Sequence, residues 1–114
     1  MKKWNKLKER FLQDILQTRL GNLASNLTRV KSRCHNIANQ DLVHRLLQES
    51  KLFIEWTAQD AEVEVAAELV DLQVQLARWQ YHWGEIWQDE IQRSKVADTA
   101  KNWSDKVLKM AGLI

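Results

Sequence analysis

VAAELVDLQVQLARWQYHWGEI, residues 65–86, is the segment from which the fold class can be recognised. Its large apolar residues recur at alternating steps of four and three, at Val65, Leu69, Leu72, Leu76, Trp79, Trp83 and Ile86. That spacing keeps all seven on one face of an α-helix. A flanking line of mostly small residues, which would let another helix approach closely, runs through Val63, Ala66, Val70, Ala77 and Gly84. We therefore predict a long helix over residues 58–92 with a broad buried face.

The same alternating spacing predicts two more helices, and a wide apolar face predicts a third over 41–56. Upstream it runs through Leu16, Leu20, Leu23, Leu27, Val30, Cys34 and Ile37. Apolar residues from Trp4 to Ile15 extend this line with a small phase shift, which predicts one helix over 3–36. The other two are expected over 41–56, starting near Asp41, and over 95–111, starting at Ser94 and ending at Gly112. A continuous helix over 41–92 is the alternative to a bend near Thr57.

Composition restricts the fold class further. The chain has 114 residues, no proline and three glycines, so it lacks the turn residues of a β-sandwich or barrel. No apolar run is long enough to span a bilayer. The Lys-rich start lacks the apolar stretch of a signal peptide, and Cys34 is the only cysteine. We expect a cytoplasmic all-α protein, an antiparallel helical bundle of about four helices, two long and two short, in one domain over 1–114.

The unequal helix lengths predict self-association. At about 1.5 Å per residue, the helices over 3–36 and 58–92 would each reach roughly 50 Å, and the other two about half that. A monomer would therefore leave part of each long helix without a neighbour. We expect a homodimer in which a second copy covers the exposed strip.

Charge is distributed unevenly along the chain. Residues 1–38 hold nine basic and two acidic side chains, residues 39–92 three basic and eleven acidic, and residues 93–114 five basic and two acidic. A basic first helix beside an acidic third helix is one interpretation. The alternative is a basic surface that binds nucleic-acid phosphates or an anionic membrane. Its candidate residues are Lys2, Lys3, Lys6, Lys8, Arg10, Arg19, Arg29 and Arg33.

Six tryptophans are the most unusual feature of the composition. Trp79, Trp83 and Trp87 recur every fourth residue and would share one broad helix face. A buried indole needs a partner for its N–H, and tryptophan is enriched at binding hot spots. These three residues are therefore either core residues or a partner-binding surface.

Few residue patterns point to catalysis or metal binding. Arg29 and His35 have an Arg-x5-His spacing that resembles the motif of the HEPN-type nucleases, although Val30 stands where that family usually has a polar residue. The resemblance implies RNA cleavage as an alternative function. His82 and Glu85 reverse the Glu-x-x-His order of di-iron bundles. Cys34 falls on a helix seam, as an inert core thiol would. We expect no cofactor, no metal and no catalytic residue.

Residues 49–58 (ESKLFIEWTA), 65–70 (VAAELV) and 76–80 (LARWQ), with Trp103-Ser104, resemble a small uncharacterised all-helical protein family of cyanobacteria. The resemblance covers the chain from about Arg19 to its end and includes no functional motif. It implies a bacterial cytoplasm and a helical fold.

These observations favour a non-enzymatic helical interaction or adaptor protein. It would present its charged and tryptophan-bearing helix surfaces to an unidentified protein partner. A nucleic-acid backbone-binding subunit of a ribonucleoprotein and a HEPN-like ribonuclease are the alternatives.

Overall fold

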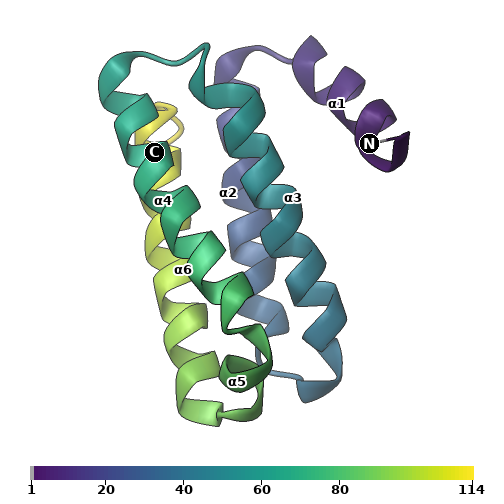
Figure 1. Ribbon diagram of the computed structural model, residues 1–114. Helices are drawn as coiled ribbons and strands as arrows, with labels where there is room; N and C mark the ends of the chain where they lie inside the picture. The colour runs from purple at the N-terminus through teal and green to yellow at the C-terminus, as the bar shows by residue number, and fades with distance from the viewer. Residues whose placement is uncertain (1) are drawn as a thin grey trace.

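The computed structural model describes residues 2–114, and every regular element in them is helical (Figure 1). The elements are α1 (Lys2–Gln13), α2 (Leu16–Arg33), a 3-10 turn η1 (Ile37–Asn39), α3 (Gln40–Ala58), α4 (Val63–Tyr81), α5 (Trp83–Gln88) and α6 (Glu90–Met110). The all-α class is confirmed. The predicted number of four helices is wrong, because six α-helices are present in this part of the chain.

The four longest helices, α2, α3, α4 and α6, run alternately in opposite directions (Figure 1). Helix α2 packs against α3 and α6, and α4 packs against α3. Helix α1 projects from the end of the molecule where α2 begins, and α5 joins α4 to α6 at the opposite end (Figure 1). The basic helix α2 therefore packs mainly against α3 and α6, and not against the acidic helix α4 as one interpretation of the charge pattern expected. The ion pair that reaches α4 comes from α6, where Lys106 Nζ lies 2.7 Å from Glu68 Oε2.

The predicted helix over 3–36 is wrong because the chain breaks before Leu16, where Ile15 is extended with φ −66° and ψ 160°. Neither glycine nor proline causes the break. Phe11 of α1 stacks on Phe53 of α3 with ring centroids 4.3 Å apart, whereas α2 turns its apolar face into the bundle. A single straight helix could not make both contacts. The small phase shift in the sequence marks this change of face.

The predicted helix over 58–92 is also wrong. Helix α3 ends at Ala58 and α4 begins at Val63, so the chain bends there and the continuous helix over 41–92 is excluded. Further on, the chain leaves helical geometry at His82 and at Asp89. The Asp89 carboxylate accepts hydrogen bonds from the backbone N–H groups of Ile91 and Gln92. Asp89 therefore caps α6 at its start, five residues before the predicted cap.

The end of α6 and the helix lengths bear on two further expectations. Gly112 ends α6 as expected, with φ 71° and a hydrogen bond from Leu113 N to Leu108 O of 2.9 Å. Helices α2, α3, α4 and α6 have 18, 19, 19 and 21 residues, so they are nearly equal in length. Unequal helix lengths therefore no longer support a homodimer.

Candidate docking site

The three tryptophans considered for partner binding lie in the core. Trp79, Trp83 and Trp87 are only 7%, 6% and 0% exposed. The indole N–H of Trp83 donates to Gln40 O at 3.1 Å, and that of Trp87 donates to Ile37 O at 2.7 Å. These bonds tie α5 to the start of α3 and to the 3-10 turn η1, and they satisfy the two donors. Trp83 and Trp87 therefore serve as core residues, and Trp79 lines a shallow groove with Ile86 and Val96.

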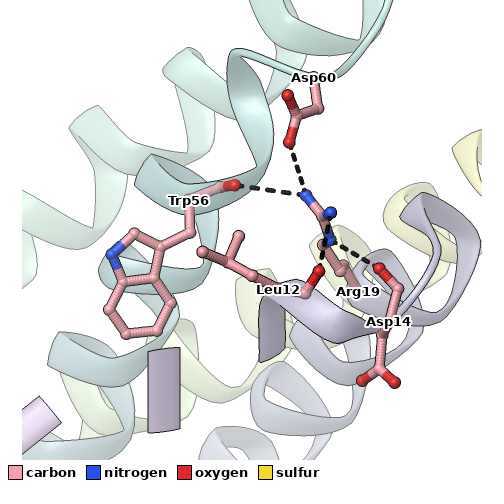
Figure 2. Close-up of polar contacts among 5 residues, drawn as sticks. All are labelled: Leu12, Asp14, Arg19, Trp56 and Asp60. Carbon is pink, nitrogen blue, oxygen red and sulfur yellow. Dashed lines mark hydrogen bonds and ion pairs between the residues drawn. The ribbon is translucent and has the colours of Figure 1, made fainter. Parts of the chain in front are cut away.

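Arg19 joins three segments of the chain (Figure 2). Its guanidinium donates to the backbone oxygens of Asp14 at 2.9 Å and Leu12 at 3.4 Å, which end α1. It also donates to Trp56 O at 3.5 Å and pairs with Asp60 Oδ2 at 2.8 Å. With its side chain only 12% exposed, Arg19 is engaged inside the fold. Arg19 is therefore less available to the predicted phosphate-binding surface than the other basic residues named for it.

The other candidate basic residues remain on the surface. Lys3, Lys6, Lys8 and Arg10 are exposed on α1, and Arg29 and Arg33 are exposed on α2. The side chain of Lys2 lies outside the described residues. Lys8 Nζ lies 6.0 Å from the ring centroid of Trp56. Helix α1 thus carries positive charge at one end of the molecule (Figure 1).

Arg29 and His35, whose spacing resembles the nuclease motif, line two different surface pockets. Arg29 lies in a groove between α2 and α6 with Ser104 and Leu108, and its guanidinium donates to Asn26 Oδ1 at 3.3 Å. His35 lines a cavity of about 120 Å³ with Cys34, Glu90, Arg93 and Ser94. The fold does not bring Arg29 and His35 together in one cavity.

The thiol of Cys34, which lines the cavity beside His35, is not activated as a nucleophile. Burial raises the pKa of the Cys34 thiol to about 11, although the positive charge of Arg93 acts in the opposite direction. The thiol therefore stays protonated near neutral pH, as expected for an inert core cysteine. His82 Nδ1 and Glu85 Oε2 are 3.9 Å apart on the surface. Within residues 2–114, no three His, Cys, Asp or Glu side chains gather as a metal site would require.

Helix α4 is apolar on two opposite faces. Its inner face places Leu69, Leu72 and Leu76 in the core, each 0% exposed. On the opposite side lies a second apolar line, which we call the outer α4 face. It consists of Val63, Ala67, Val70, Val74, Ala77 and Tyr81.

All six residues of the outer α4 face are exposed. Val63 and Tyr81 are 81% and 85% exposed, and Val70 and Val74 are 50% and 46% exposed. The line follows steps of four and three along the whole helix, which is the spacing of a helix-packing seam. Since two residues along a helix turn about 200°, Val70 and Val74 point away from Leu72. The outer α4 face therefore has the spacing of a helix-packing surface but no neighbour in the described chain.

The repeat that forms this face is present in the sequence. The line of mostly small residues that we predicted beside the core, however, combines only some of its members with residues that lie elsewhere. That line used Ala66 and Gly84, whereas Ala66 is half-buried and Gly84 belongs to α5. Ala67, Val74 and Tyr81 complete the exposed repeat instead. A search for a second alternating repeat on the same helix would have found it.

Comparisons with protein-family models, with curated proteins and with solved structures found no match to this chain. Among the helices described, none combines the length and the apolar character needed to cross a membrane.

Proposed function

We propose that this protein is a non-enzymatic helical interaction module that docks a protein partner through the outer α4 face. The observation that carries the proposal is a complete apolar helix seam in contact with solvent. A helix that is apolar on two faces is expected to be covered on both. Contiguous exposed apolar surface commonly marks an interaction site.

The residues that flank the outer α4 face support docking of another helix. Glu64, Asp71 and Arg78 follow one side of the seam, and Gln73 and Gln80 follow the other. An apolar centre with a polar rim is the usual anatomy of a protein interface. The two alanines, Ala67 and Ala77, leave room for a partner helix to approach closely.

A photo-crosslinker tests this proposal in extracts of the source cells. Tyr81 is replaced by p-benzoylphenylalanine, which resembles it in shape, and Ile91 receives the same residue in a control protein. Both positions are highly exposed, at 85% and 69%, but Ile91 lies on α6 away from the seam. We expect discrete adducts from position 81, and we expect them to disappear when Val70→Gln and Val74→Gln are added.

Equal adduct patterns from positions 81 and 91 would contradict the proposal, as would adducts that persist in the double glutamine variant. Circular dichroism of each variant serves as the folding control. The glutamine changes should leave it unaltered, because both valines lie outside the core.

Binding to a nucleic-acid backbone through α1 is the second candidate function. The exposure of Lys3, Lys6, Lys8 and Arg10 on one projecting helix favours it. We expect Lys6→Glu with Arg10→Glu to abolish binding to single-stranded RNA, and wild-type affinity to fall steeply as salt rises. Binding that ignores salt or survives the double change would exclude this candidate.

We also propose a location in the bacterial cytoplasm. The one cysteine, Cys34, is free and buried, which suits a reducing compartment.

A further inference from the structure

We propose that the occupant of the outer α4 face is a second copy of this chain, packed antiparallel to the first about a two-fold axis at the level of Leu72. This inference rests on the proposed function and names the partner. It follows from the symmetry of the seam, from its flanking charges and from its extent.

The outer α4 face is symmetric in sequence about Leu72. Val70 and Val74 lie two residues on either side of it, and Ala67 and Ala77 lie five residues on either side. Val63 and Tyr81 complete the pattern at nine residues. In an antiparallel pair, each valine at 70 would meet Val74 of the other copy, and each Ala67 would meet Ala77.

Such a pairing places equivalent surfaces in contact, as a two-fold interface requires. The alanine layers allow close approach on both sides of the axis, and the valine layers fill the centre. At each end the small Val63 would meet the large Tyr81. A parallel pair would instead place Tyr81 against Tyr81 at one end and Val63 against Val63 at the other.

The charged flank is complementary in the antiparallel arrangement. Antiparallel packing brings the same flank of both helices together, so Glu64 of one copy would lie near Arg78 of the other, twice in each dimer. Neither residue forms an ion pair within its own chain among the side chains described, residues 3–114. In a parallel pair, this flank would meet the side that carries Gln73 and Gln80, and the charges would have no partners.

Asp71 is the exception on this flank, because it would lie near its own copy at the axis. Like charges at this position weaken the pair.

The extent of the seam also limits the affinity of the pair. Helix α4 has 19 residues and is roughly 28 Å long, so one helix pair makes a smaller interface than the standard size. We therefore expect dissociation constants in the micromolar range.

Cysteine crosslinking of the purified full-length chain tests the arrangement. Three proteins are compared: Ala67→Cys, Ala77→Cys and the double variant. In the antiparallel pair, position 67 of one copy lies ten residues, or about 15 Å along the helix axis, from position 67 of the other copy. The same separation applies to position 77, and it is beyond disulfide reach. Each single variant should therefore stay uncrosslinked on mild oxidation, and the double variant should form about ten times more covalent dimer. The wild-type chain, with Cys34 only 3% exposed, is the control.

Each outcome decides the proposal. Crosslinking confined to the double variant supports the antiparallel pair. Efficient crosslinking of either single variant overturns it in favour of a parallel pair. Absence of crosslinking in all three overturns self-pairing, and adducts from position 81 in cell extracts would then assign the face to a different protein.

A charge exchange provides a second readout. We expect Glu64→Arg to weaken self-association about five- to tenfold, because each dimer would lose two attractive pairs. Adding Arg78→Glu should restore the affinity. Since Glu64 and Arg78 also suit the ends of their own helix, dissociation constants rather than stabilities are compared. Failure of the double variant to recover would contradict the pairing.

Discussion

Arg19 shows how one side chain can stabilise a break between two helices in a segment that the sequence pattern predicts as one continuous helix. Its guanidinium binds the carbonyl oxygens left free where α1 ends, and it holds them against the end of α3 (Figure 2). The sequence showed only a basic residue in a basic segment. Its role depends on Asp60, 41 residues further on, and such distant pairings do not follow from local spacing.

We expect Arg19→Ala to destabilise the fold by about 1.5–3 kcal/mol, the usual range for hydrogen bonds to a charged group. Arg29, which is exposed and donates to the nearby Asn26, is the matched control, and its replacement by Ala should cost less than about 0.5 kcal/mol. Urea unfolding measures both. Hydrogen exchange should also accelerate across residues 2–13 in Arg19→Ala. Equal stability of the two variants would contradict the role assigned to Arg19.

At the scale of elements, α4 has a buried inner face and an exposed apolar outer face. The inner face followed directly from the alternating repeat at Leu69, Leu72 and Leu76. Several helix ends did not, because they depend on caps and turns without glycine or proline. The start of α6 at Asp89 is the clearest case, whereas a bend near Thr57 and the end of α6 at Gly112 were predicted.

The two faces of α4 predict opposite effects of substitution. Leu72→Ala should destabilise the monomer by about 2–5 kcal/mol, since it empties a fully buried position. Val74→Ala should change monomer stability by less than about 0.5 kcal/mol, because it lies on the outer face. Both are measured by denaturant unfolding at concentrations below the dimer range. A Val74→Ala cost equal to that of Leu72→Ala would mean that the two faces are misassigned.

Asp89 at the start of α6 predicts a dependence on pH. Hydrogen bonds from the backbone of Gln92, its side chain and the backbone of Ile91 lower the pKa of the Asp89 carboxyl below its usual value of 3.8. Its contribution to stability is therefore present above that value and is lost as the pH falls through it toward the lower folded value.

We expect Asp89→Asn, which keeps the accepting oxygen but lacks the charge, to lower the Tm at neutral pH. The difference from wild type should shrink as the pH falls from about 5 to about 2. Exposed Asp98, also on α6, serves as the matched control through Asp98→Asn. A difference in Tm that stays constant over this range would contradict the assigned role of the carboxylate.

At the scale of the whole molecule, the absence of proline and the repeats at steps of four and three were sufficient to predict an all-α fold. They were not sufficient for the functional surface. Trp83 and Trp87 looked suited to a partner, but each N–H finds a backbone oxygen near the start of α3. Conversely, Ala67 and Val74 belong to the candidate site. The sequence contains their repeat, but the fold was needed to show that this face of α4 is exposed.

Sedimentation equilibrium determines whether the outer α4 face is an interface between copies of this chain. At about 100 μM, a concentration suited to a weak interface, wild type should have twice the 13.4 kDa mass of one chain. Val74→Lys should be a monomer, and the exposed control Ile91→Lys should remain a dimer. A monomeric wild type, or a Val74→Lys variant that still forms dimers, would show that this face is not the interface.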